Sequence, residues 1–248
     1  PLIPPGIGMI VYGSLANASV GRLFMAGISV GLLLMVAMMI LNYIIAKKRG
    51  YTSIREERVT AGEFVRVLKA AILPLCLPIL IIGGIRIGAV TPTEAGAVAV
   101  VYSLLLGVFY RELTVKKVIQ AFRETLLTTG SIMLIIGAVS SIAWVFTNEK
   151  IPQTLLNFMV SHIDNKYVFL ILVNIFLLLV GMFVEGNAAA VMLIPILAPI
   201  AQAYNIDLIH FGMIWVFNMS IGGITPPMGT LIYVTCGVTG CSIKGVVR

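Results

Sequence analysis

The feature that most constrains the fold is an interruption inside a long apolar segment near the C-terminal end. Residues 218–234 read NMSIGGITPPMGTLIYV, so three glycines and a Pro-Pro pair fall where a membrane helix is expected. In a helix interior, glycine costs about 1 kcal/mol and proline about 3 kcal/mol relative to alanine. Proline also lacks an N–H group, so carbonyl groups one turn earlier lose their partners. We therefore predict a helix broken within the membrane, with its unpaired carbonyl oxygens directed at a cation.

The start of the sequence resembles this interrupted segment. Residues 1–12 read PLIPPGIGMIVY and residues 223–233 read GITPPMGTLIY. Each has a Pro-Pro pair, then small residues, then an apolar stretch that reaches a tyrosine. Interrupted apolar segments in matching positions of two halves are typical of inverted-repeat transporters, and they indicate where the binding site lies.

The composition is that of an integral membrane protein. Of the 248 residues, 59% are hydrophobic and 11% are charged, whereas a soluble domain carries about 25% charged residues. The net charge of +7 fits basic cytoplasmic loops in a lipid bilayer and does not require a nucleic-acid partner. The three cysteines have neither metal-ligand spacing nor a disulfide framework. The sequence therefore predicts an all-α integral membrane protein with several spans.

Apolar runs and polar breaks divide the chain into three parts. Residues 1–20 are interpreted as the remnant of a first broken helix, and the sequence is expected to be a fragment of a longer protein. Residues 21–125 contain further spans and an amphipathic surface arm at 51–69. The remaining part, 126–248, is expected to contain a span at 128–147, a hairpin at 167–204 and a broken helix at 208–240.

The hairpin has a polar tip at Glu185, Gly186 and Asn187. At 1.5 Å per residue each arm is about 25 Å long, which is short for a full crossing. We therefore predict a re-entrant hairpin with its tip near mid-membrane. A carboxylate at that depth indicates a function, so Glu185 would face a bound cation or be protonated and bonded to backbone. A tip nearer the membrane surface would remove this role.

Two other motifs predict local structure. Thr91-Pro92-Thr93-Glu94 has the pattern of a capping box at the start of a helix. Gly27 and Gly31 have the GxxxG spacing that allows close packing of a helix.

The interruptions predict the ion sites. Sodium needs several oxygen ligands, which the carbonyl groups of a broken helix and a threonine hydroxyl supply without a buried charge. A proline kink that serves only packing is the structural alternative. The predicted sodium site, closed by the hairpin tip, consists of Gly222, Gly223, Ile224, Thr225 and Pro226, and a second, incomplete sodium site is predicted at Pro4 and Pro5.

An anionic substrate is expected between the interrupted segments. The half-helix N-termini near 228–230 and 187–189 would offer free N–H groups at the positive end of a helix dipole. Serines at 140 and 141 would add hydroxyl groups, although serines in membrane helices often bond to their own helix. The predicted substrate residues are Glu185, Gly186, Asn187, Ser140, Ser141, Met228 and Gly229. The sequence contains no nucleophile pattern or metal-ligand spacing, so we do not expect an enzyme.

Four stretches share the pattern of one known family. They are residues 83–102 (GGIRIGAVTPTEAGAVAVVY), 111–114 (RELT), 180–201 (VGMFVEGNAAAVMLIPILAPIA) and 210–232, which contains TPPMG. As a set they resemble the C-terminal part of the large membrane subunit, the DctM-type permease, of tripartite ATP-independent periplasmic (TRAP) transporters.

The resemblance implies an elevator-type, sodium-coupled secondary transporter in the bacterial inner membrane, with inverted repeats whose N-terminal half is incomplete here. Residues 21–125 would then belong to the scaffold, and 126–248 to the transport core. The implied partners are a small membrane subunit (DctQ-type) and a periplasmic solute-binding protein. The implied substrate is a small organic acid, such as a C4-dicarboxylate or sialic acid. The alternative is a sodium/anion symporter of related fold that works without a binding protein.

Overall fold

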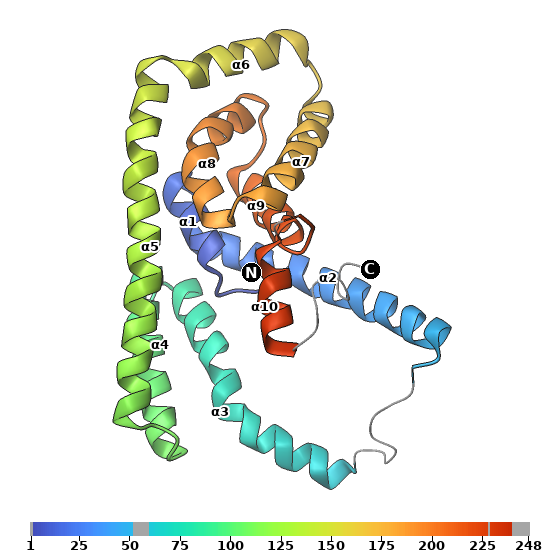
Figure 1. Ribbon diagram of the computed structural model, residues 1–248, viewed down its shortest axis with the longest axis vertical. Coiled ribbons are helices and arrows are strands. Elements are labelled where there is room, and N and C mark those ends of the chain that lie inside the picture. The colour runs from blue at the N-terminus through green and yellow to red at the C-terminus, as the bar shows by residue number, and fades with distance from the viewer. Residues whose placement is uncertain (1, 52–59, 228, 240–248) are drawn as a thin grey trace.

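The computed structural model describes residues 2–51, 60–227 and 229–239. All regular elements in this part of the chain are α-helices (Figure 1). Six of them, α2 to α5, α7 and α8, are long and apolar enough to cross a membrane. The chain is thus an all-α protein with several candidate spans. The helices are α1 (Ile7–Leu15), α2 (Val20–Arg49), α3 (Ala61–Arg86), α4 (Pro92–Phe109), α5 (Val115–Asn148), α6 (Ile151–His162), α7 (Lys166–Phe183), α8 (Gly186–Ala203), α9 (Leu208–Gly222) and α10 (Thr230–Thr239).

The buried core lies where α1, the start of α2, α7, α8 and α9 pack together. Its largest fully buried side chains include Trp215, Tyr12 and Phe211. Helix α7 packs chiefly against α9, while α8 packs chiefly against α1 and α5. Helices α3, α4 and α5 lie to one side (Figure 1) and keep most of their apolar side chains exposed. Their exposed faces are therefore available to lipid or to other protein.

Tyr12 fixes α1 to α9. Its hydroxyl donates a hydrogen bond to the carbonyl oxygen of Leu208 at 2.8 Å. Its ring lies against Gly212, where an added Cβ would come within 2.5 Å of a ring carbon. A glycine is needed at this crossing because any side chain would separate the two helices.

The GxxxG motif of α2 receives the N-terminal segment of the same chain. A Cβ on Gly27 would lie 2.9 Å from the carbonyl oxygen of Leu2, and one on Gly31 would lie 2.7 Å from the side chain of Ile3. The close packing that the motif predicts thus occurs within this chain.

The helix starting at Pro92 has the capping box that the sequence predicts. The hydroxyl of Thr91 accepts a hydrogen bond from the N–H of Glu94 at 3.3 Å, and the carboxylate of Glu94 accepts one from the N–H of Thr91 at 2.7 Å. Glu94 therefore acts as a helix cap.

Two predicted boundaries are absent. Helix α3 runs unbroken from Ala61 through the predicted end of the surface arm at residue 69 and on to Arg86; residues 52–59 of the predicted arm (51–69) lie outside the described part of the chain. Helix α5 likewise extends the predicted span, 128–147, back to Val115. At both junctions the polarity changes without a helix-breaking residue, and a change of polarity alone does not end a helix.

Candidate functional site

The helix expected over 208–240 is interrupted. Helix α9 ends at Gly222 and α10 begins at Thr230. The last turn of α9 tightens, because the N–H of Ile224 donates to the carbonyl oxygen of Ile221 at 3.1 Å and that of Thr225 to Gly222 at 2.9 Å. The Pro226–Pro227 peptide bond that follows is cis, as is the bond between Pro4 and Pro5 before α1.

Two carbonyl oxygens of the interruption converge on Gly229. A Cβ added to Gly229 would lie 2.8 Å from the carbonyl oxygen of Gly223 and 2.9 Å from that of Thr225. The first accepts a hydrogen bond from the N–H of Leu231 at 2.9 Å, whereas the second receives none from a described backbone N–H. The hydroxyl of Thr225 donates to the carbonyl oxygen of Ile221 at 2.7 Å, which leaves lone pairs on its own oxygen. The two convergent carbonyl oxygens are ligands of the kind that a hard cation binds.

The end of α9 is pressed against the backbone of α7. A Cβ on Gly222 would lie 2.6 Å from the Cα and the carbonyl carbon of Gly181. No residue larger than glycine fits at this contact without moving one of the two helices.

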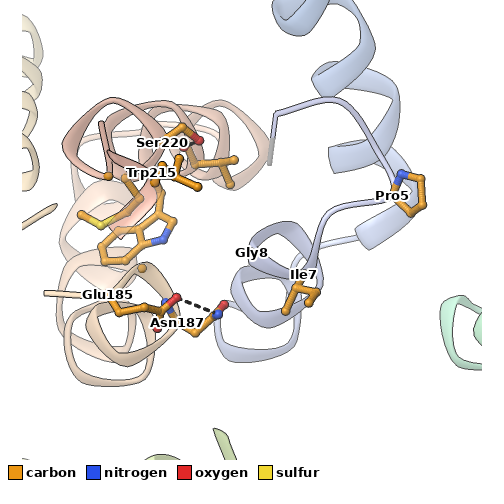
Figure 2. Close-up of a pocket in the computed structure, with 12 residues that line it drawn as sticks. Pro5, Ile7, Gly8, Glu185, Asn187, Trp215 and Ser220 are labelled. Carbon is orange, nitrogen blue, oxygen red and sulfur yellow. Dashed lines mark hydrogen bonds between the residues drawn. The ribbon is translucent and has the colours of Figure 1, made fainter. Parts of the chain in front are cut away.

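Glu185 caps the second arm of the hairpin. Its carboxylate accepts hydrogen bonds from the N–H groups of Asn187 at 2.9 Å and Ala188 at 3.1 Å, and from the side-chain amide of Asn187 at 2.9 Å (Figure 2). The N–H of Ala189 donates to the carbonyl oxygen of Glu185. The N–H groups expected to be free for a substrate at 187–189 are therefore not free, because the chain's own carboxylate and carbonyl occupy them.

A cavity of about 380 Å³ lies where the hairpin tip meets the two Pro-Pro segments. Figure 2 shows the tip residues on one side of this space and the N-terminal segment on the other. Its lining comes from the N-terminal segment (Pro5, Ile7, Gly8), the tip (Glu185, Gly186, Asn187), α9 (Trp215, Val216, Met219, Ser220), Gly223 and Leu231. The interrupted segments and the tip thus share one cavity.

Five residues of the predicted sites line this cavity: Pro5, Glu185, Gly186, Asn187 and Gly223. The other predicted residues are not among its described lining residues. Pro4, Gly222 and Gly229 are buried, Thr225 is half-buried, and Ile224 and Pro226 are exposed. Met228 lies outside the described residues.

Ser140 and Ser141 are not part of the lining. Both are exposed on α5, and the hydroxyl of Ser140 donates to the carbonyl oxygen of Ile136 at 2.6 Å. The hydroxyl of Ser140 is therefore bonded to a carbonyl oxygen of its own helix. This is the alternative role given above for serines in membrane helices.

The sequence interpretation missed the face of α9 that lines the cavity. Trp215 and Met219 precede the predicted residue Gly223 by eight and four positions and so lie on the same side of the helix. Helical periodicity counted back from the glycines would have found them. Asn218, one turn before Gly222, was also missed, although it is only 2% exposed.

The charges around the cavity favour a cation. Among the described residues that line the cavity, Glu185 alone is ionisable, and none is a lysine, arginine or histidine. The described residues also contain no group of three His, Cys, Asp or Glu side chains that would hold a transition metal.

Comparison with known proteins places the chain in a family. Residues 1–248 match the family described as "Tripartite ATP-independent periplasmic transporter, DctM component". The chain is 41% identical over 239 residues to the sialic acid TRAP transporter large permease protein SiaM of Vibrio cholerae, covering 96% of this chain and 56% of that protein. It is 40% identical over 248 residues to the C4-dicarboxylate TRAP transporter large permease protein DctM of Pseudomonas aeruginosa, covering 100% of this chain and 58% of that protein.

A third relative carries another substrate name. The chain is 36% identical over 244 residues to the isethionate TRAP transporter permease protein DctMQ of Oleidesulfovibrio alaskensis, covering 98% of this chain and 38% of that protein. The chain spans about half the length of the curated relatives it matches. These relatives are named as transporter permeases, not as enzymes. The chain belongs to the DctM family of tripartite ATP-independent periplasmic transporters, and it is a multi-pass membrane protein.

Proposed function

We propose that the chain forms the ion- and substrate-binding part of a large TRAP permease that imports a small organic acid together with sodium across the bacterial inner membrane. The observation that carries this proposal is the shared cavity between the hairpin tip and the two Pro-Pro segments. Secondary transporters of inverted-repeat architecture bind substrate and coupling ions at such interrupted elements.

The proposed sodium site lies at the interruption after α9. The convergent carbonyl oxygens of Gly223 and Thr225 and the hydroxyl of Thr225 support it. Because no cationic side chain lies among the described lining residues, sodium would also compensate the negative charge of the acid. This gives a physical reason for coupling, since the acid binds more tightly once the ion is present.

The proposed substrate class rests on cavity size and on the named relatives. Cavities that hold small molecules measure roughly 300–1,000 Å³, and this one is about 380 Å³. The relatives are named for sialic acid, C4-dicarboxylates and isethionate, which all carry an acidic group.

The proposed movement is of the elevator type. The buried group of α1, α7, α8 and α9 would move as one body past the exposed helices α3 and α4. The start of α2 packs into that buried group through Leu23 and Phe24, so the boundary between scaffold and core would fall within α2. The proposed partners are a small membrane subunit and a periplasmic solute-binding protein.

Uptake by the intact permease tests this function. The full-length protein with its small membrane subunit is placed in liposomes and offered labelled N-acetylneuraminate, succinate or isethionate. We expect uptake of one of these acids only with an inward sodium gradient and the binding protein. Uptake that persists when potassium replaces sodium would contradict the coupling. Sodium-driven uptake without the binding protein would instead support the related symporter.

A further inference from the structure

Trp215 presents an unpaired hydrogen-bond donor to the cavity. Its side chain is 1% exposed and lines the cavity, and Figure 2 shows the indole nitrogen on the side that faces Gly8. No other described residue forms a hydrogen bond with this N–H. No fully shielded side-chain nitrogen or oxygen in the described chain lacks a partner, so the indole nitrogen opens onto the cavity.

The other side-chain donors of the lining already bond within the chain, although the amide of Asn187 uses only one of its two N–H groups. The side-chain amide of Asn187 donates to Glu185, and the hydroxyl of Ser220 donates to the carbonyl oxygen of Val216 at 2.7 Å. An indole N–H is a donor only. It therefore suits an oxygen atom of a ligand and cannot bind a cation.

The N-terminus of α1 lies on the opposite wall. Its N-cap is Gly6, which has no side chain to cap the helix, and no described backbone carbonyl accepts a hydrogen bond from the N–H groups of Ile7 or Gly8. Both residues line the cavity. Helix α8, by contrast, has its first N–H groups occupied by Glu185. The N-termini of α1 and α8 therefore differ at the cavity, and that of α1 has available donors.

We propose that an acidic group of the transported molecule, a carboxylate or sulfonate, binds between the indole N–H of Trp215 and the N-terminal N–H groups of α1 at Ile7 and Gly8. This inference rests on the proposed function and names the residues that hold the substrate's charge. A helix N-terminus favours an anion through its free N–H groups and its dipole. The indole N–H fixes the orientation of the anion from the other side, which makes Trp215 a specificity-determining residue.

The first test compares Trp215→Phe, which keeps an aromatic ring but removes the N–H, with Trp215→His, which keeps a ring N–H. The intact permease with its small subunit and binding protein is assayed in liposomes with whichever of succinate, N-acetylneuraminate or isethionate the wild type imports. Trp215→Phe is expected to raise the KM for the acid about tenfold, because a hydrogen bond to a charged group is lost. Its half-saturating sodium concentration should change little, and Trp215→His should recover part of the loss. The control is Trp144→Phe, since Trp144 is 69% exposed on α5.

The second test addresses α1. Gly8→Pro removes one N–H from the first turn, where proline is tolerated, and Gly8→Ala adds a Cβ that meets no atom within 4 Å. Gly8→Pro should raise the KM for the acid more than Gly8→Ala does. A fluorine NMR signal from 5-fluorotryptophan at position 215, assigned by its loss in Trp215→Phe, should shift when the acid is added with sodium.

The outcomes separate the two proposals. If the wild type imports an acid with sodium while Trp215→Phe keeps the wild-type KM and the fluorine signal does not move, the anion site is wrong and the proposed function stands. If the wild type imports none of the three acids, the proposed function itself fails. A Trp215→Phe protein that does not fold would lose sodium-driven uptake altogether. The fluorine signal of the wild type is then assigned by its loss in Trp215→His and decides alone.

Discussion

The side-chain amide of Asn218 donates a hydrogen bond to the Oδ1 atom of Asn174 across 2.7 Å, joining α9 to α7 one turn before α9 ends. Each side chain is also bonded to its own helix: Asn218 donates to the carbonyl oxygen of Ile214, and Asn174 to that of Leu170. Together with the backbone contact between Gly181 and Gly222, this pair fixes the end of α9 on α7. The end of α9 is thus held against the first arm of the hairpin.

Replacing Asn218 with leucine should weaken this attachment. The substitution leaves the Oδ1 of Asn174 without its partner, and interhelical side-chain hydrogen bonds in membrane proteins contribute about 0.6 kcal/mol on average. We expect a small drop in the thermal stability of the intact permease and a weaker apparent affinity for sodium. In the double variant Asn174→Leu/Asn218→Leu the losses should be less than additive. Fully additive losses would show that the two residues act independently.

Gly222→Ala should abolish close packing at the α7–α9 contact. The added Cβ would lie 2.6 Å from backbone atoms of Gly181, and such overpacking costs about 1–3 kcal/mol. Sodium-driven uptake should fall at least about fivefold, since 1.4 kcal/mol corresponds to tenfold. Gly137→Ala on α5 is the control, because a Cβ there meets no atom within 4 Å. Equal uptake by the two variants would rule out this packing requirement.

Gly229→Ala should disturb the proposed ion site directly. Its methyl group would enter the space between the carbonyl oxygens of Gly223 and Thr225, 2.8 Å and 2.9 Å away. If these oxygens hold sodium, the half-saturating sodium concentration for uptake should rise by about tenfold, corresponding to 1.4 kcal/mol. An unchanged sodium dependence in a folded variant would show that this cluster of oxygens is not an ion site.

Glu185 is predicted to act mainly as the cap of α8. Removal of a capping side chain costs about 1 kcal/mol, so Glu185→Ala should lower both thermal stability and uptake. Glu185→Gln keeps an acceptor oxygen for the N–H groups of Asn187 and Ala188, and it should therefore retain more of each. If Glu185→Gln loses sodium dependence while remaining as stable as the wild type, the carboxylate is an ion ligand instead.

The parts of the fold that sequence alone predicts are those with a strong local signal. Gly222 to Gly229 and the tip at Glu185 stand out because glycine, proline and charge are costly within apolar helices. The capping box at Thr91 is likewise local. The unbroken helices α3 and α5 were not predicted, because nothing in the sequence distinguishes a change of environment along one helix from the start of another.

The remaining features depend on which surfaces meet in three dimensions. Gly181 and Gly222 are far apart in the sequence, and only their contact explains why both must be small. Glu185 was expected to face an ion or to bond to backbone, and the sequence does not show that the N–H groups of Asn187 and Ala188 lie within reach of its carboxylate. Trp215 has the appearance of a core residue in the sequence, and only the cavity shows that its N–H is available.

The central claim is that the interruption after α9 binds sodium, and direct binding tests it most simply. Binding of radioactive sodium to the purified, full-length permease is measured for the wild type, Thr225→Val and Thr235→Val. Both threonine hydroxyls donate to the carbonyl oxygen four residues earlier, so the two variants make the same chemical change. We predict that Thr225→Val weakens sodium binding about tenfold, corresponding to 1.4 kcal/mol, while Thr235→Val binds as the wild type does. Equal binding by the two variants, or no sodium binding by the wild type, would contradict the claim.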